Sequence, residues 1–260
     1  MMSVLELNGV TKKFGGITAC KDISFSINQG QIMGLIGPNG AGKTTAFNLI
    51  TGVYGVTAGE ILLGGKSITG KRPDQIVRLG ISRTFQNIRL FRNLSVLDNV
   101  CIAVDRHETY YLGEGLLRLP KISKKEKQIR ELSMGYLAAV GLENKASLKA
   151  DSLPYGLQRK LEIARALALK PKLLLLDEPA AGMNPEESLE LSKLIRRLHG
   201  TYALTTLLIE HHMDVVMYLC EKIFVMNFGE KLAEGTAGEI QKNPDVLKAY
   251  LGEGYKRARN

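Results

Sequence analysis

The chain has 260 residues, of which 45% are hydrophobic and 23% charged, a balance typical of globular proteins with a substantial core. This composition excludes a disordered, a collagen-like or a disulfide-rich scaffold, and the length allows one large domain or two small ones. Lys and Arg number 35 against 26 Asp and Glu, which gives a net charge of +9. A basic surface suits nucleic acid, phosphate ligands or anionic lipid and does not choose among them. No apolar run approaches the ~20 residues of a membrane helix.

The first third of the chain has the pattern of short strands separated by glycine turns. Apolar and polar residues alternate at 4–7 and 23–27, and a further short strand pattern follows a turn at 59–63, which predicts an antiparallel sheet with one solvated face. Residues 32–36, Ile-Met-Gly-Leu-Ile, are apolar without a break, as in a parallel strand buried on both faces. We therefore expect an N-terminal antiparallel part beside a parallel sheet.

The middle and the last third differ in character. Residues 95–149 have a helical composition and predict a mostly helical insertion. After it, strand and helix patterns alternate, which predicts a parallel sheet with helices on both faces. The expected strands are 173–176, 205–209 and 222–226, and the expected helices are 186–199 and 213–220.

A glycine-rich segment carries the strongest functional motif. Residues 37–44, Gly-Pro-Asn-Gly-Ala-Gly-Lys-Thr, fit G-x-x-x-x-G-K-[ST] and lie between an apolar strand and a helical pattern, which is the context of a phosphate-binding loop. Backbone N–H groups and the helix N-terminus would hold phosphate oxygens, Lys43 would reach the β- and γ-phosphates, and the Thr44 hydroxyl would bind Mg²⁺. The predicted nucleotide-binding residues of this loop are Gly37, Pro38, Asn39, Gly40, Ala41, Gly42, Lys43, Thr44 and Thr45.

Two carboxylates complete the expected nucleotide site. The apolar run 173–176 ends in Asp177 and Glu178, which places both at the carboxyl edge of the sheet, beside the loop. Asp177 could join the magnesium ligands, and Glu178 could act as the base that activates a water for attack on the γ-phosphate. The pair predicts nucleoside triphosphate hydrolysis. No Asn-Lys-x-Asp motif for guanine occurs, so ATP is preferred over GTP.

With these motifs in this order, the chain resembles the ATP-binding-cassette (ABC) family over nearly its whole length. The resemblance implies an α/β P-loop NTPase with a RecA-like parallel-sheet core, an N-terminal antiparallel β subdomain and a helical insertion subdomain. The chain would be a single ABC ATPase domain, 1–260. Within it we expect a nucleotide-binding core at 1–90 and 159–240, a helical subdomain with the signature segment at 91–158, and a C-terminal helix with a basic tail at 241–260.

The resemblance also assigns roles to single residues. Gln86, in Arg-Thr-Phe-Gln-Asn, matches the glutamine loop, which touches Mg²⁺ and the attacking water and couples to the transmembrane partner. His211 matches the switch histidine that contacts the γ-phosphate, and it is preferred over its neighbour His212. Phe14 matches the aromatic residue that stacks on adenine, although a lone Phe after a strand is as often part of a core. Lys43, Gln86, Glu178 and His211 are thus the expected catalytic residues, and Thr44, Gln86 and Asp177 the expected magnesium ligands.

The signature segment departs from the family pattern Leu-Ser-Gly-Gly-Gln. Residues 153–158 are Leu-Pro-Tyr-Gly-Leu-Gln, so Gly156 keeps the close backbone approach to nucleotide, whereas Pro154 lacks the serine hydroxyl and Leu157 replaces the glutamine. In the family this segment binds ATP held by the opposite subunit. The departure therefore weakens a contact between subunits and leaves the chain's own phosphate loop intact. Asn184 stands where many members carry aspartate. Its amide can form hydrogen bonds but carries no charge, so a second contact between subunits differs from the family pattern.

Several segments outside the ATP motifs resemble one subfamily, the ATP-binding subunits of branched-chain amino-acid importers. They are residues 14–16, 83–86 with 89–91, the long insertion, 180–185 and 243–252. The resemblance implies a peripheral ATPase at the cytoplasmic face of the cell membrane, which powers uptake of branched-chain or other hydrophobic amino acids through transmembrane permease subunits. It further implies ATP and Mg²⁺ as cofactors, and a second ATP-binding subunit, identical or related, that closes an ATP sandwich. A periplasmic or extracellular substrate-binding protein would be an indirect partner, and no nucleic-acid partner is expected.

Other functions remain as alternatives. The nearest is the ATPase of a lipopolysaccharide or other ABC exporter, which shares the ATP machinery. A soluble ABC protein of translation or DNA repair is less favoured, because such proteins carry two cassettes or a long coiled coil, and this chain has one phosphate loop and no sustained heptads. A nucleotide-binding regulator without turnover is disfavoured by Glu178 and His211.

Overall fold

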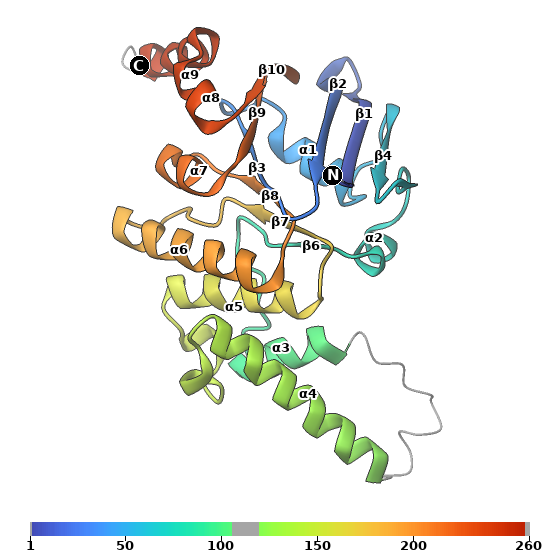
Figure 1. Ribbon diagram of the computed structural model, residues 1–260, viewed down its shortest axis with the longest axis vertical. Helices are drawn as coiled ribbons and strands as arrows, with labels where there is room; N and C mark the ends of the chain where they lie inside the picture. Colours follow the sequence, from blue (N-terminus) through green and yellow to red (C-terminus); the bar gives the residue numbers. More distant parts are fainter. Residues whose placement is uncertain (1, 106–119, 258–260) are drawn as a thin grey trace. The chain divides into compact units, whose positions relative to one another are not determined.

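The computed structural model describes residues 2–105 and 120–257 (Figure 1). Its contacts divide the chain into two compact units: a first unit, Met1–Ile81 with Lys172–Asn260, and a second unit, Ser82–Pro171. Residues 106–119 of the expected insertion and 258–260 of the expected basic tail lie outside the described residues. None of the helices in the described ranges has an apolar stretch of the length that a bilayer requires. The functional division expected at 91–158 stays a prediction.

Four strands of the first unit form an antiparallel sheet in the order β2-β1-β4-β5. They are β1 (Ser3–Phe14), β2 (Ile17–Asn28), β4 (Ala58–Leu63) and β5 (Lys66–Ser67). In β2 the alternate residues Ile23, Phe25 and Ile27 are buried, so the apolar face of the sheet faces the core. The predicted antiparallel part is confirmed. Its first two strands are longer than predicted, because their register shifts around Gly9 and interrupts the alternation.

A second sheet has six strands in the order β10-β9-β3-β8-β7-β6. They are β3 (Ile32–Ile36), β6 (Ile81–Arg83), β7 (Leu173–Asp177), β8 (Thr206–Ile209), β9 (Lys222–Asn227) and β10 (Glu230–Gly235). β3 pairs in parallel with β8 and β9, and β7 with β8, which confirms the predicted parallel sheet. β10 runs antiparallel to β9 and was not predicted.

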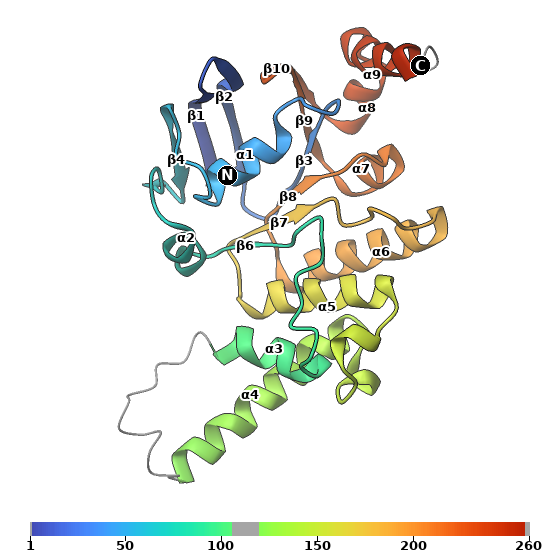
Figure 2. The same ribbon diagram turned by 180° about the vertical axis from the view of Figure 1, so that it is seen from behind.

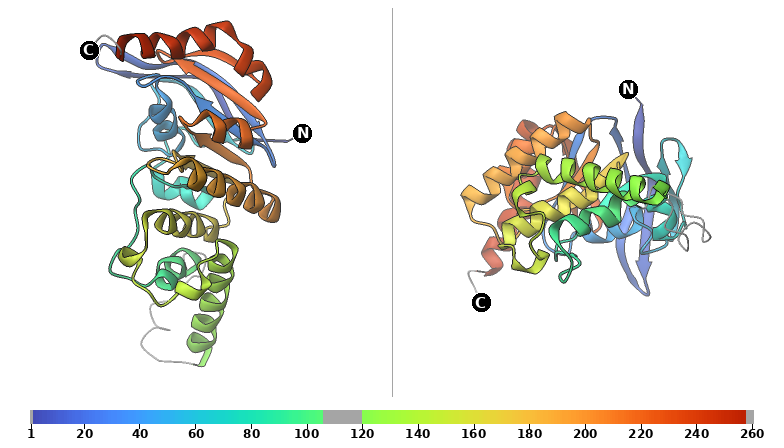
Figure 3. Two further views of the ribbon diagram at one scale, coloured as in Figure 1. Left: turned by 90° about the vertical axis from the view of Figure 1, so that its left-hand side faces the viewer. Right: turned by 90° about the horizontal axis from the view of Figure 1, so that it is seen from below.

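Helices lie on both faces of the six-stranded sheet (Figure 3). On one face, Phe47 of α1 (Lys43–Ile50) belongs to the same buried cluster as Phe25 and Phe224, so this face packs against α1 and the antiparallel sheet. On the other face, a Cβ built at Gly34 would lie 3.5 Å from Val216 of α7 (Met213–Leu219), which shows how closely this helix approaches β3. The remaining helices of the first unit are α2 (Pro73–Leu79), α6 (Pro185–Tyr202), α8 (Ala237–Lys242) and α9 (Pro244–Arg257).

The second unit is helical, as the composition of residues 95–149 predicted. Its helices are α3 (Val96–Asp105), α4 (Pro120–Ala139) and α5 (Tyr155–Ala168), with short 3-10 turns η1 (Glu143–Lys145) and η2 (Ala150–Ser152). α3 packs against both α4 and α5 (Figure 2). A bridge between Ser95 and Lys149 ties the start of α3 to the segment that leads to α5. The second unit thus includes the signature segment and ends at Pro171.

Candidate functional site

The loop between β3 and α1 is shaped by close backbone contacts. Gly37 has a φ of 149°, and a Cβ built there would lie 2.1 Å from the carbonyl oxygen of Met226. Gly42 has a φ of 101°, and its Cβ would lie 2.4 Å from the carbonyl oxygen of Ala19. No side chain fits at either position, so these two glycines allow the chain to turn from the strand into the helix.

Lys43 begins α1 and lies inside this loop. Its side chain is buried, and Nζ donates to the carbonyl oxygens of Gly37 at 2.6 Å and Pro38 at 2.8 Å. The same helical turn carries Thr44, which is exposed, and Thr45, which is half-buried. The ammonium group adds to the partial positive charge of the helix N-terminus, so this end of α1 is suited to bind phosphate.

A pocket of about 430 Å³ opens beside the loop, within the first unit. It gathers the predicted loop residues from Asn39 to Thr45 together with Glu178 and His211. Its lining residues are Ile17, Thr18, Ala19, Asn39, Gly40, Ala41, Gly42, Lys43, Thr44, Thr45, Glu178, His211, Phe228 and Gly229. Gly37 and Pro38 are not among the lining residues, but their carbonyl oxygens accept hydrogen bonds from Lys43. The structure thus brings most of the predicted phosphate site into one pocket.

The two predicted carboxylates lie at the end of β7. Asp177 is the last residue of the strand and is buried. Glu178 has a φ of 47°, a left-handed conformation that is costly for a residue with a side chain, and its N–H donates to the carbonyl oxygen of Ile209 at 2.9 Å. Glu178 Oε1 lies 2.8 Å from His211 Nε2. The expected base and the expected switch histidine are therefore in direct contact.

Glu210, which sequence reasoning left without a role, organises this edge of the sheet. Its side chain is 1% exposed, and Oε1 accepts a hydrogen bond from the N–H of Ala180 at 2.7 Å. Oε2 accepts from the N–H groups of His211 at 2.9 Å and His212 at 3.2 Å. One carboxylate thereby fixes the loop after Glu178 and the loop that carries His211. The position of an acid directly after an apolar strand is the signal that could have identified it.

The two neighbouring histidines line different pockets. His212 Nδ1 lies 3.3 Å from Glu210 Oε2, and its side chain lines a different pocket, between α6 and α7. His211 lies against Glu178 and lines the pocket beside the phosphate loop. The geometry therefore places the preferred histidine, rather than its rival, next to the phosphate loop.

The expected adenine-stacking residue Phe14 is not among the residues that line this pocket. Its ring packs edge-on against Tyr54 with centroids 5.1 Å apart, and Lys12 Nζ lies 4.9 Å from its centroid. An aromatic residue that the sequence did not single out does line the pocket: Phe228, which is 87% exposed and has a φ of 47°. Its place before Gly229, in the turn between β9 and β10, is a recognisable hairpin pattern.

Gln86 and Gly156 belong to the second unit. The backbone carbonyl of Gln86 accepts a hydrogen bond from Arg159 of α5 at 2.8 Å. Gly156 lies in the first turn of α5, and a Cβ built there would meet nothing in the described chain within 4 Å. Pro154 is the N-cap residue and makes no side-chain cap, while Gln158 Nε2 donates to the carbonyl oxygen of Leu153 at 2.8 Å. Gln158 thus ties the first turn of α5 to the residue that precedes its N-cap.

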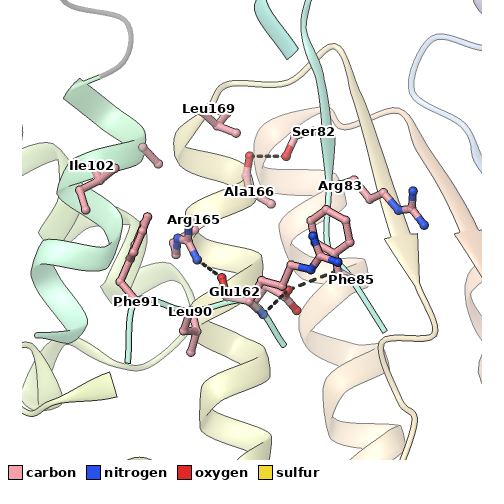
Figure 4. Close-up of a pocket in the computed structure, with 12 residues that line it drawn as sticks. Ser82, Arg83, Phe85, Leu90, Phe91, Ile102, Glu162, Arg165, Ala166 and Leu169 are labelled. Carbon is pink, nitrogen blue, oxygen red and sulfur yellow. Dashed lines mark hydrogen bonds between the residues drawn. The ribbon is translucent and has the colours of Figure 1, made fainter. Parts of the chain in front are cut away.

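A groove of about 650 Å³ lies within the second unit, next to the glutamine loop (Figure 4). Arginine side chains stack on its aromatic rings: Arg89 lies 4.2 Å from the ring centroid of Phe85, and Arg165 lies 4.9 Å from that of Phe91. Burial lowers the pKa of Arg165 and raises that of Glu162. The lining residues are Ser82, Arg83, Phe85, Arg89, Leu90, Phe91, Ile102, Ala103, Glu162, Arg165, Ala166 and Leu169.

Comparisons with known proteins decide the family. The family model described as ABC transporter matches residues 20–181, and one described as branched-chain amino acid ATP-binding cassette transporter matches residues 230–256. The chain belongs to the ABC transporter family. It is an ABC-type ATPase and binds ATP, as the phosphate loop and the resemblance predicted.

Among curated proteins, the chain is 44% identical to the high-affinity branched-chain amino acid transport ATP-binding protein BraF of Pseudomonas aeruginosa, over 96% of this chain and 98% of BraF. It is 32% identical to the lipopolysaccharide export system ATP-binding protein LptB of Acidithiobacillus ferridurans, over 98% and 100% of the two chains. The exporter ATPase is thus the more distant of the two.

Solved ABC cassettes have the same fold. The ADP conformation of the cassette MJ1267 matches with a TM-score of 0.84 and 31% identity, over 97% of this chain and all of that chain. A dimeric post-hydrolysis state of the cassette MJ0796, bound to ADP and Pi, matches with a TM-score of 0.73 and 26% identity over 90% and 98%. These likenesses confirm the predicted P-loop NTPase fold of the ABC type.

The donor groups at this ABC site fit a nucleotide with its divalent cation. The described residues contain no group of three or more His, Cys, Asp or Glu arranged to hold a metal ion by themselves. Mg²⁺ prefers few protein ligands together with phosphate oxygens. An exposed hydroxyl at Thr44, in the first turn of α1, and a buried carboxylate at Asp177, at the end of β7, suit that requirement.

Proposed function

We propose that the chain is the ATP-hydrolysing subunit of a membrane importer for branched-chain or other hydrophobic amino acids. The observation that carries this proposal is the pocket in which Lys43, Glu178 and His211 meet the phosphate loop, in a chain of the ABC family. The cargo is inferred from the matching C-terminal segment at 230–256 and from the near full-length similarity to BraF.

The residues of the pocket divide the chemistry among them. Asn39 to Thr45 bind the phosphates through backbone N–H groups, and Lys43 neutralises the β- and γ-phosphates. Glu178 takes a proton from the attacking water, whose oxygen bonds to the γ-phosphorus as the bond to the ADP oxygen breaks. Thr44 and Asp177 would hold Mg²⁺, with Gln86 as the further ligand that the family resemblance implies, and the ion would supply charge neutralisation at the phosphates.

His211 works through its contact with Glu178. The 2.8 Å separation allows Nε2–H to donate to the carboxylate, which holds the Glu178 side chain in place at the pocket. The left-handed backbone at Glu178 is the strained feature expected of a residue whose position the reaction requires. His211 can also present its ring to the γ-phosphate, because it lines the same pocket.

Two kinds of protein partner follow from the proposal. A second ATP-binding subunit, identical or related, would cover the nucleotide with its signature segment, and the open space around Gly156 supports such a close approach. Transmembrane permease subunits would dock in the groove beside the glutamine loop, whose stacked arginines and exposed Phe91 suit an amphipathic segment with acidic residues. A substrate-binding protein would act through the permeases, and the chain would lie at the cytoplasmic face of the membrane.

A pull-down tests the proposal. Tagged Glu178→Gln protein, purified from native membranes in a mild detergent with ATP, should bring down two multispanning permeases and an ATP-binding subunit. The Lys43→Ala protein, treated in the same way, is the control for assembly that needs nucleotide. Ligand binding to the associated substrate-binding protein would then identify the amino acid. Recovery of lipopolysaccharide-export components, ribosomes or DNA-repair factors would leave the ATPase in place and refute the importer.

A further inference from the structure

Arg159, on the second turn of α5, has the largest of the fully buried side chains. Its Nη1 group donates to the carbonyl oxygen of Phe85 at 2.6 Å and to Glu162 Oε2 at 2.7 Å. Its Nη2 group donates to the carbonyl oxygen of Gln86 at 2.8 Å and to the Tyr155 hydroxyl at 3.1 Å. The guanidinium therefore holds two successive carbonyls of the glutamine loop, one of them that of Gln86 itself.

Glu162, one turn further along α5, holds the same loop by its N–H groups. Its Oε1 accepts hydrogen bonds from the N–H of Phe85 at 3.2 Å and of Arg89 at 3.3 Å (Figure 4). The two side chains thus bind the loop from residue 85 to residue 89 through donors and acceptors alike. Both belong to one helix and are linked by their own ion pair.

Burying this ion pair lowers the net stability of the folded state. The side chains of Arg159 and Glu162 are 0% and 5% exposed, and desolvating two charges costs several kcal/mol per ion before their attraction offsets it. Arg159 Nε, moreover, has no hydrogen-bond partner among the described residues. Apolar side chains would pack a helix against a loop at lower cost. What the ion pair adds is a defined position for the loop backbone.

We propose that Arg159 and Glu162 are positioning residues that lock Gln86 to the signature helix α5. The inference rests on the proposed role of Gln86 in the ATPase and names what controls it. The first turn of α5 carries Tyr155 and Gly156, and the Tyr155 hydroxyl is itself a partner of Arg159. A nucleotide or subunit that contacts the signature segment would therefore act on the glutamine loop of the same chain.

A double-mutant cycle tests the proposal in the full-length protein. The variants are Gln86→Ala, Arg159→Met and the double variant, and the measurements are kcat and the Mg²⁺ concentration for half-maximal binding of a fluorescent ATP analogue. We expect either single change to lower kcat and raise the Mg²⁺ requirement about tenfold. The double variant should be no worse than Gln86→Ala, because Arg159 would act only through that residue.

Two further variants separate positioning from folding. Arg130→Met makes the same chemical change at an exposed arginine of the same unit, and it should leave kcat and the Mg²⁺ requirement unchanged. Glu162→Gln keeps an oxygen acceptor for the loop but removes the ion pair, and it should shift the Mg²⁺ requirement in the same direction as Arg159→Met. Amide hydrogen exchange at residues 85–89 should become faster in both Arg159→Met and Glu162→Gln.

The outcomes are distinguishable. If Gln86→Ala lowers activity while Arg159→Met and Glu162→Gln change only thermal stability, or if the effects of Gln86 and Arg159 add, the proposal is wrong and the ATPase assignment stands. If Gln86→Ala itself changes neither measurement, the role of the glutamine falls, and the proposal falls with it.

Discussion

Two buried glutamates, one in each unit, hold functional loops by accepting backbone N–H groups. In the first unit, Glu210 accepts from Ala180, His211 and His212. In the second unit, Glu162 accepts from Phe85 and Arg89 and is also paired with a buried arginine. In both units a buried carboxylate thus holds loop backbone by accepting N–H groups. The neighbour of the carboxylate differs: it is Arg159 for Glu162 and the ring of His212 for Glu210.

The difference reflects where each loop begins. The loops that Glu210 fixes start directly at the ends of β7 and β8, which pair in parallel within the six-stranded sheet, so the sheet already positions them. The glutamine loop leaves the short strand β6 and is held by α5 through an ion pair and hydrogen bonds. The comparison teaches that the first unit carries a preformed reaction pocket, while the second holds a loop whose position depends on one helix.

Glu178→Gln tests most strongly whether the chemistry belongs to the first unit. Removing a general base should lower kcat by roughly 10²- to 10⁴-fold, while ATP binding persists because the phosphate loop is unchanged. Phosphate release measured at saturating ATP gives kcat, and titration with a fluorescent ATP analogue gives the affinity. Glu60→Gln, at an exposed acid of β4, is the matched control. Turnover near that of the unaltered protein would remove Glu178 from its role.

Lys43→Ala should act on binding. The ammonium group bridges the loop carbonyls of Gly37 and Pro38, and its charge-assisted contacts to phosphate are worth about 1.5–3 kcal/mol. We expect the Kd for the ATP analogue to rise about ten- to hundredfold. Lys66→Ala, at an exposed lysine of β5, should leave it unchanged. An unaltered Kd in Lys43→Ala would contradict the phosphate-binding role.

Glu210→Gln addresses the comparison of the two glutamates directly. The new amide group would meet backbone N–H donors where the carboxylate accepted from them, which leaves buried donors unpaired at a cost of about 1–3 kcal/mol. Denaturant unfolding measures this loss, and Glu221→Gln, at an exposed acid of the same unit, is the control. Glu162→Gln should lose more stability than Glu210→Gln, because it leaves the buried guanidinium of Arg159 without its counter-charge. The reverse order would show that the ion pair does not decide the difference between the two glutamates.

The parts of the fold and the site that could be predicted are those determined by a short continuous stretch of sequence. Gly37 to Thr44 form one continuous motif, and the apolar runs of β3 and β7 identify themselves as buried strands. β10 was missed because Glu-Lys-Leu-Ala-Glu-Gly alternates weakly and is mostly polar. Its pairing with β9 depends on a turn at Phe228 and Gly229 rather than on its own composition.

The supporting contacts could not be read in this way. Arg159 meets Phe85 across 74 positions of the sequence, and Glu210 meets Ala180 across 30. Both side chains look like ordinary polar residues of a helix and a loop until the fold brings their partners to them. The residues expected to react were therefore visible in the sequence, and the residues that hold them were not.

Gly156→Ala should have the smallest effect of these variants on the second unit. The change should stabilise the folded chain slightly while it weakens assembly with a second subunit. Nothing in the described chain meets a Cβ at this position, and alanine favours a helix over glycine by about 0.5–1 kcal/mol. Gly135→Ala, at an exposed glycine of α4 with equally open surroundings, should raise the free energy of unfolding by a similar amount. If Gly156 is open because a nucleotide bound to a second subunit approaches it, only Gly156→Ala should reduce ATP-dependent dimer formation in the Glu178→Gln background. Sedimentation at several ATP concentrations measures that difference. Equal dimerisation of the two variants would mean that the open space at Gly156 serves no contact between subunits.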